Sequence, residues 1–426
     1  MTGPNWVRWV LYLVLGRLFN RPQLLVALSR ALERVGIPIA CGLDDLIKVY
    51  RRTDDFSNRA HFENLVAGDF VIGMDSGPHQ MRERMALGDV LPDMVRFGDL
   101  AHTEACARIQ TIKVDLERGG SFDLVNDYLV FVAWNALRGA FDAPSSASIE
   151  GVPASAPPAA RDAALTVLFQ ELRHVGGHLV VGGVAPRSVQ VRAQGSADAL
   201  NQRVARSLAD IDAAWRAGCP YAAQTAQRQA VGLMWVGHPA MVQAGALIFQ
   251  ELQAHRHQYK ELHAFVGQHL EASRTSAKIR EEVRRKVRGH VLECLRLRPP
   301  FPLLSRLLPR DADLQLGSAK KTRIRTIAAG HSVYLAIAAA LRTRADYDPE
   351  RALVDWKNPD RLPVFGVGPR ACVAREQVVE LLVSALIGVL SLPLLGFADA
   401  GRGRIVYDGP IVTRLRLKRA LTAATP

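Results

Sequence analysis

The stretch Phe365-Gly-Val-Gly-Pro-Arg-Ala-Cys372 decides more about this chain than any other segment. It presents one cysteine on a glycine-rich loop, with an arginine two residues before the cysteine. Residues without bulky side chains leave backbone N–H groups free to donate to a sulfur, and a guanidinium binds carboxylates well. The loop therefore suits a thiolate bound to haem iron, with Arg370 holding a haem propionate. An ordinary turn that carries a buried thiol explains the same residues equally well.

A second motif precedes this loop in the sequence. Glu293 and Arg296 stand one helical turn apart, and Pro299 and Pro300 follow where the helix must end. By itself the pair fits a solvated surface ion pair, because any amphipathic helix can offer this spacing. Followed downstream by a Gly-x-Gly-x-Arg-x-Cys loop, it becomes a specific combination.

In this combination and order, the sequence resembles the cytochrome P-450 superfamily of haem-thiolate enzymes over most of its length. The resemblance implies a mainly α fold with small β-sheets and a haem b whose iron is bound by Cys372. The loop residues that would contact the haem are Phe365, Gly366, Gly368 and Arg370. Ala374 departs from the family, in which glycine is commonest at this position.

The resemblance also assigns a structural role to the upstream motif. Glu293 and Arg296 would form an ion-pair triad with a third arginine of the family pattern. Arg351, in the stretch Asp-Pro-Glu-Arg, matches that third arginine best.

Three further residues are expected to bind the haem propionates by this resemblance. Residues 77–84 look like the propionate-binding helix and contribute His79 and Arg84. The family pattern His-x-x-x-Arg would need histidine where Gln80 stands, so Arg84 is the stronger candidate. Arg306 matches another propionate-binding arginine of bacterial members, and arginines facing carboxylates make electrostatic sense.

The stretch Val236-Gly-His-Pro-Ala-Met241 matches the family's long distal helix, which crosses the haem face opposite the cysteine. Family members carry an acid and an alcohol there, and these relay protons to bound dioxygen. Here Pro239 and Ala240 stand at those two positions. We assign Gly237, His238, Pro239 and Ala240 to the catalytic face, and we expect the proline to bend the helix because it removes a backbone hydrogen bond.

The missing pair leaves three functions open. The first is a monooxygenase with an atypical proton relay through substrate groups, ordered water or His238. The second is an enzyme that uses peroxide or rearranges hydroperoxides, and the third is a catalytically degenerate haem-binding interaction protein. An imidazole titrates near neutrality and could act as distal acid, but in the family a histidine at this place usually points away from the iron. A structural role is therefore favoured for His238.

Composition limits the partners. The chain has 426 residues, of which 49% are hydrophobic, and nothing divides it, so residues 1–426 are expected to form a single domain. The net charge of +13 suits an acidic ferredoxin or reductase docking on the cysteine side, and no nucleic-acid motif accompanies it. Five scattered cysteines favour a cytoplasmic protein. The apolar content of the stretches that would cap the pocket suggests a small apolar organic substrate.

Four segments carry local expectations. Residues 1–35 begin with an apolar helix that is too interrupted by arginine to cross a bilayer, and packing is favoured over peripheral membrane contact. Residues 143–160 are rich in proline, serine and alanine and predict a flexible loop. Residues 381–397 predict a buried helix beneath the cofactor, and the valines of residues 177–183 predict a short strand.

Overall fold

The structure is a computed structural model that describes residues 5–19, 21–58, 66–68, 70–140, 149–153, 155–181, 185–207, 229–316, 323–342, 344, 346–399 and 405–420. Within these ranges the fold is mainly helical with small sheets, which confirms the predicted fold class. Most of the long helices precede residue 298, and most of the strands follow it.

The helices of the first half lie between residues 5 and 206. They are α1 (Asn5–Phe19), α2 (Pro22–Val35), α3 (Leu43–Arg51), α4 (Pro78–Val90), α5 (Met94–Glu117), the π-helix η2 (Leu124–Leu129), α6 (Val130–Leu137), the 3-10 turn η3 (Arg138–Ala140), α8 (Pro158–Val181) and α9 (Arg187–Arg206). Helix α4 confirms the helix predicted around residues 77–84, and Pro78 starts it at a position where proline is favoured.

The helices of the second half contain both sequence motifs and the distal stretch. They are the π-helix η5 (Leu233–Gly237), α12 (His238–Ala254), α13 (Arg256–Thr275), α14 (Ala277–Leu297), α15 (Ile337–Leu341), α16 (Pro349–Trp356), the 3-10 turns η6 (Pro363–Phe365) and η7 (Gly368–Arg370), and α17 (Arg375–Leu390). Helix α14 ends next to Pro299, as its sequence predicts.

The strands form small sheets at the periphery. In one sheet β1 (Ile39–Ala40) pairs parallel with β6 (Ser332–Leu335), which pairs antiparallel with β3 (Leu304–Leu307). In another, β10 (Arg416–Arg419) lies between β2 (Ser121–Asp123) and β7 (Leu395–Phe397), antiparallel to both. Two antiparallel hairpins join β4 (Ala312–Leu316) to β5 (Arg323–Ile327) and β8 (Val406–Asp408) to β9 (Ile411–Arg414).

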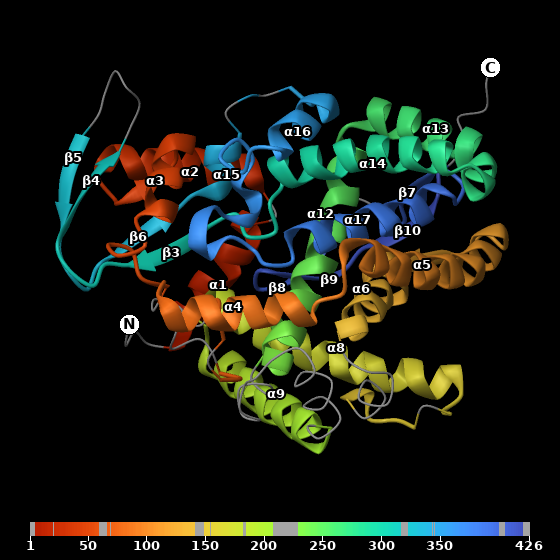
Figure 1. The fold of residues 1–426 in the computed structure, drawn as a ribbon, viewed down its shortest axis with the longest axis horizontal. Coiled ribbons are helices and arrows are strands. Elements are labelled where there is room, and N and C mark those ends of the chain that lie inside the picture. Colours follow the sequence, from red (N-terminus) through yellow and green to blue (C-terminus); the bar gives the residue numbers. More distant parts are fainter. Residues whose placement is uncertain are drawn as a thin grey trace.

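Helix α12 crosses the middle of the molecule, with α14 and α17 on one side and α6 and α8 on the other (Figure 1). Helix α17 packs along α5, and its residues from Val379 to Leu390 are all buried. The buried helix predicted for residues 381–397 is therefore confirmed as far as Leu390, whereas Leu395–Phe397 form strand β7 instead. One described segment, residues 229–254, has the length and apolar character of a membrane span, but 78% of its most apolar part is buried inside the protein.

One local prediction differs from the structure, and a second is only partly covered by the described residues. The predicted strand at residues 177–183 is helical as far as Val181, because α8 continues there and packs Gly177 against Ile411. Part of the predicted flexible loop, residues 143–148, lies outside the described residues. Within the described part of that loop Ile149 and Glu150 are buried, and Trp134 Nε1 donates to Glu150 Oε1 at 2.7 Å.

Candidate active site

The cysteine loop owes its shape to two glycines. Gly366 and Gly368 have φ angles of 72° and 70°, in the left-handed region where a side chain causes strain. The loop closes where the Cys372 amide donates to Phe365 O at 2.8 Å, which brings the thiol back beside the start of the motif. Ala374 has φ −98°, so the departure from the family's glycine costs no backbone strain here.

The surroundings of Cys372 act on its thiol in opposite directions. Burial raises the pKa of Cys372, whereas a hydrogen bond from the Ala374 amide and the guanidinium groups of Arg84 and Arg375 lower it. Arg375 is held in place by stacking 3.6 Å from the ring centroid of Trp356. Burial is the stronger influence, so the pKa of Cys372 is raised overall, and the two cations only partly oppose this rise.

Arg370 reaches away from the cysteine towards the segment after α3. Its guanidinium donates to the carbonyl of Phe56, to Thr53 O at 2.9 Å and to Ser76 Oγ at 3.1 Å. Asp75 Oδ1 lies 3.5 Å from Nη2. Arg370 therefore fastens the cysteine loop to residues 53–76, in addition to any contact with a propionate.

Arg306 is a buried cation for which the structure gives no carboxylate partner among the described residues. Arg306 is 6% exposed, and its Nη1 donates to the backbone oxygen of Ser305 at 2.8 Å. The guanidinium lies 5.8 Å from the ring centroid of Tyr50. Burial is the main cause that lowers the pKa of Arg306 to about 10, and repulsion from Arg370 adds to it. The carboxylate of Asp75 opposes this shift from a distance and forms no ion pair with Arg306. A buried guanidinium is costly without an anion, so this position fits a carboxylate ligand.

Helix α4 presents Gln80 and Arg84 to the cysteine loop. Gln80 is buried and its Nε2 donates to Pro369 O at 3.2 Å. Arg84 lies close enough to Cys372 for the two groups to influence each other's pKa. His79 instead pairs with Glu83, with 3.2 Å between Nε2 and Oε1, and its side chain is 65% exposed. The structure thus differs from the sequence assignment at His79, because one residue along a helix turns the side chain to another face.

Glu293 and Arg296 form a buried ion pair, with Arg296 Nη2 and Nε 2.7 and 2.8 Å from the two carboxylate oxygens. The third arginine of the cluster is Arg344, whose Nη2 lies 3.2 Å from Glu293 Oε2. Arg351 lies elsewhere, 3.2 Å from Asp355. The assignment of Arg351 to the triad was therefore wrong, because the turn before α16 brings an earlier arginine onto the carboxylate.

This ion-pair cluster also fixes the chain that leads to the cysteine loop. Arg296 donates to the backbone oxygens of Leu341 and Asp346 at 3.0 and 2.8 Å, and the Asp348 amide donates to Glu293 at 2.9 Å. Helix α16 starts directly afterwards and packs Trp356 edge-on against Phe365, with 5.7 Å between ring centroids. The cluster thus positions the cysteine loop through α16.

The distal stretch bends through a π-helix. Residues 233–237 form η5, and the His238 amide donates to Met234 O where α12 begins. Pro239 has no amide hydrogen to donate to Trp235 O, which explains why regular α geometry is interrupted at this place. Gly176 of α8 packs against the bend, because a Cβ there would lie 2.9 Å from Trp235 O and 3.2 Å from Pro239 Cγ.

His238 points into the protein on the side of α6 and α8. Its Nε2 lies 2.9 Å from Val130 O, and its ring stacks on Phe169 with 4.7 Å between centroids. A carbonyl only accepts, so Nε2 carries the proton, while Nδ1 is buried and has no hydrogen-bond partner among the residues that the structure describes. Burial lowers the pKa of His238 to about 4, and Arg173 adds to this effect. His238 is thus a neutral packing residue at ordinary pH.

Three small or apolar residues form the open side of the bend. Val236, Gly237 and Ala240 are partly accessible, whereas Leu233, Met234, Trp235, His238, Pro239 and Met241 are buried. Residues 236 and 240 are one turn apart and so share a face of the helix. That face carries no titratable or hydroxyl group, which agrees with the loss of the acid and alcohol noted in the sequence.

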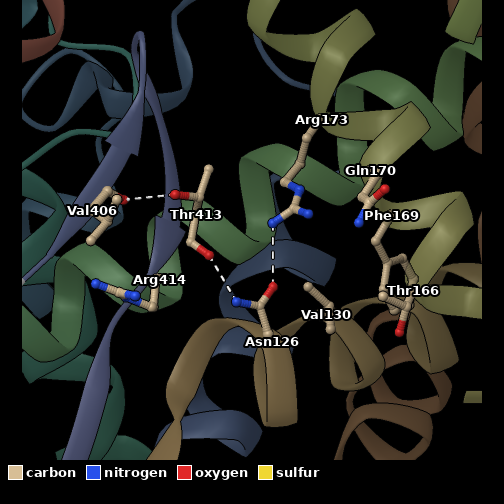
Figure 2. A pocket seen from close by; sticks show the side chains of 9 residues that line it. All are labelled: Asn126, Val130, Thr166, Phe169, Gln170, Arg173, Val406, Thr413 and Arg414. Atoms are coloured by element: carbon tan, nitrogen blue, oxygen red, sulfur yellow. Dashed lines mark hydrogen bonds between the residues drawn. The ribbon is translucent and has the colours of Figure 1, made fainter. Parts of the chain in front are cut away.

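A separate pocket of about 480 Å³ lies between η2, α8 and the β8–β9 hairpin (Figure 2). Asn126 links its walls, because it accepts from Arg173 at 3.3 Å and donates to Thr413 O at 2.9 Å. Val130 and Phe169 line it and also contact His238, so this pocket lies behind the imidazole. None of the residues assigned to the cofactor or to catalysis lines it.

Sequence reasoning missed four residues of this site. Arg344, Arg375 and Gly176 belong to no spacing that singles them out, since their partners come from distant parts of the chain. Gln80 carried a signal, because it occupies the family's histidine position and an amide can replace an imidazole as a donor.

No family model matches the sequence, and no curated protein matches it. Solved structures do match its fold. CalO2 superposes with a TM-score of 0.69 at 19% identity, over 95% of this chain and 97% of that one. P450BioI, crystallised with acyl carrier protein ligated to hexadec-9Z-enoic acid, has a TM-score of 0.69 at 14% identity, over 95% of this chain and 100% of its own.

A six-coordinated cytochrome P450 from Thermus thermophilus superposes with a TM-score of 0.65 at 18% identity, over 94% of this chain and 98% of its own. The fold of this chain is mainly helical, with the cysteine loop before α17 and a π-helix at the start of the central helix α12. This chain has the cytochrome P450 fold over nearly its whole length, which confirms at the level of the fold the resemblance read from the sequence.

Proposed function

We propose that this protein binds haem b through Cys372 and is a haem-thiolate monooxygenase that oxidises a small, mainly apolar molecule. The observation that carries the proposal is Arg306, a buried guanidinium without a carboxylate partner among the described residues, beside the loop that presents the cysteine. A haem propionate would supply the missing anion. The P450 fold of the chain supports this choice of ligand.

The residues on both sides of the proposed site fit this cofactor. Arg84 and Arg375 partly oppose the rise that burial causes in the pKa of Cys372 and would stabilise a sulfur bound to iron, and Arg306 offers a donor pair to a propionate. Val236, Gly237 and Ala240 leave the opposite side without bulky or charged groups. A cysteine-ligated haem, when bound, supplies oxygen activation, which the electron-rich sulfur favours.

The distal bend favours a second candidate, a peroxide-using or hydroperoxide-rearranging enzyme. Pro239 and Ala240 offer no proton, and His238 is neutral and hydrogen-bonded to Val130 on another side of the helix. Dioxygen chemistry would then need protons from substrate groups or ordered water, because no side chain of residues 233–241 can deliver them. A peroxide already carries its protons and avoids this need.

The first experiment tests the cofactor. The reduced, haem-loaded protein should show the red-shifted carbon monoxide difference band typical of thiolate ligation, and Cys372→Ser should lose it. Cys294→Ser is a matched control, since that thiol is fully buried elsewhere in α14 and should leave the band unchanged. Intact haem without the red-shifted band in the unaltered protein would remove Cys372 from the axial position.

The second experiment separates the two oxidants. Product formation should be compared with reductant plus dioxygen and with hydrogen peroxide or a lipid hydroperoxide, over a panel of apolar substrates. The double variant Pro239→Glu/Ala240→Thr restores the acid and alcohol and should raise the share of dioxygen consumption that yields product. Unchanged coupling would mean that the missing pair does not limit the reaction. Turnover with neither oxidant would favour the non-enzymatic reading.

We further propose that an acidic ferredoxin or reductase donates electrons at the cysteine side of a cytoplasmic enzyme. Lys357 and Arg361 follow α16 on the surface, and Trp356 next to them contacts Phe365 of the cysteine loop. Cations at this position would attract an acidic carrier and raise its association rate. Replacing both by glutamine should slow reduction at low salt and leave peroxide-driven turnover unchanged; equal rates at low salt would contradict the docking site.

A further inference from the structure

Helix α1 exposes apolar side chains on most of its surface. The large side chains that face solvent are Trp6, Trp9, Val10, Leu11, Leu13 and Val14. More than half of the large exposed apolar side chains in the described parts of the chain lie in residues 6–37, with Leu24 and Leu28 of α2 among them. Isolated exposed apolar residues are ordinary, but a contiguous group marks a contact surface.

The orientation of α1 is fixed by its opposite face. Tyr12, Gly16 and Phe19 are buried at helical spacing, and Tyr12 Oη donates to Asp408 Oδ1 at 2.8 Å. Gly16 lies against the β8–β9 turn, since a Cβ there would be 2.6 Å from Gly409 O. The Arg187 amide at the start of α9 donates to Asn5 Oδ1 at 3.0 Å. The packed helix predicted from the sequence is thus correct for one face, and the remaining apolar faces point outward.

The exposed apolar surface of α1 and α2 is bordered by positive charge. Residues 1–32 contain no aspartate or glutamate, but they contain Arg8, Arg17, Arg21 and Arg30. Glu33 near the end of α2 is half-buried and accepts a hydrogen bond from the Cys41 amide. The last three arginines are exposed around the apolar side chains, and Trp6, Val10 and Leu13 run in one row that ends at Arg17. An apolar face bordered by cations complements a surface of apolar tails and anionic headgroups.

We propose that α1 and the neighbouring exposed side chains of α2 dock this protein on the surface of a membrane that contains anionic lipids. With 15 residues α1 is about 22 Å long, too short to cross a hydrocarbon layer of about 30 Å, so it lies flat. Tryptophan and arginine are suited to this depth, because their polar ends reach the headgroups while their apolar parts stay in the acyl boundary.

A second copy of the chain is the other occupant to consider, and the charges oppose it. A twofold contact through α1 would place the same patch on both sides of the interface. Arginines would then face arginines with no acid from residues 1–32 between them. Anionic lipid removes this repulsion, whereas self-association does not.

The experiment uses the full-length, haem-loaded protein and sedimentation with vesicles. Binding should be measured to vesicles of phosphatidylcholine alone and of phosphatidylcholine with phosphatidylglycerol, at low and at high salt. Binding should require the anionic lipid and weaken with salt. Leu13→Glu should reduce the partition coefficient at least about tenfold. Val354→Glu on α16 is the matched control, since Val354 is 56% and Leu13 54% exposed, and it should change nothing.

The charge component has its own variants. Arg17→Gln and Arg21→Gln should each weaken binding about fivefold, as expected for a cation near an anionic surface. Arg274→Gln, whose side chain is 64% exposed on α13, should not. Absence of binding to anionic vesicles would overturn the proposal, and so would binding that is unchanged in Leu13→Glu. A dimer in solution that dissociates in Leu13→Glu would overturn it as well. None of these results depends on the carbon monoxide band, so the cofactor proposal is tested separately.

Discussion

His238 allows a prediction whose size follows from the structure. The imidazole is 1% exposed and stacks on Phe169, and within the described parts of the chain its one hydrogen-bond partner is the carbonyl of Val130. Protonation would put a charge on a buried ring whose Nδ1 has no acceptor. For this reason burial lowers the pKa of His238 from 6.5 to about 4, while the unfolded chain keeps an ordinary value.

The sign of the effect on stability follows from linkage. The unfolded state binds the proton as the pH falls below about 6.5, whereas the folded state does so only near pH 4. The contribution of the neutral, buried His238 to the free energy of unfolding is therefore complete above pH 6.5 and is lost between pH 6.5 and 4. Between pH 7.5 and 4.5 this histidine alone should cost about 2.5 kcal/mol of the free energy of unfolding.

The assay is urea denaturation of the haem-loaded protein at several pH values between 8 and 4.5. His238→Gln keeps a donor for Val130 and cannot titrate. Over this pH range the free energy of unfolding of the variant should therefore fall by about 2.5 kcal/mol less than that of the wild type. His257→Gln is the control, because His257 is 79% exposed on α13. Parallel loss of stability in the wild type and in His238→Gln would refute the reasoning and reopen a role for His238 as an acid.

Three further predictions test the ion pair, the propionate arginine and the bend. Glu293→Gln should destabilise the protein by about 3–5 kcal/mol in urea titrations, because it leaves buried guanidinium groups unpaired, whereas the exposed Glu271→Gln should cost less than about 1 kcal/mol. Arg306→Gln should weaken haem retention roughly tenfold or more, measured by haem transfer to a scavenger protein, yet leave the haem-free protein equally or more stable. Gly176→Ala should lower stability by about 1–3 kcal/mol through contact with Trp235, and Gly195→Ala, a helical glycine with open space, should raise it.

Much of the site could be predicted because its residues lie in short, continuous motifs. Gly366, Gly368 and Cys372 form one loop, and the positive φ angles of the two glycines are a local requirement that the sequence displays. The pairing of Glu293 with Arg296 depends only on helical spacing. Pro239 marked the bend for the same reason, although only the structure shows that a π-helix accommodates it.

The errors arose where a contact joins distant segments or depends on helix rotation. Arg344 lies before α16 and Arg351 in its first turn, and no local pattern says which of the two reaches Glu293. His79 and Gln80 are adjacent, and the rotation of α4 against the cysteine loop buries the second. Valines at residues 177–181 favour a strand by propensity, but packing of α8 against the distal bend and Ile411 makes them helical.

The sequence by itself determined the cysteine loop, the ion-pair helix and the lack of a proton donor at positions 239 and 240, because each depends on residue type and short spacing. Only the tertiary structure decided that Arg306 is a buried cation beside the cysteine loop and that His238 is turned away from the open side of its helix. It also decided that α1 packs by one face and exposes the others. The burial of a side chain and the direction in which it points depend on which distant segments pack together. The residues that decide this packing are spread over the whole chain.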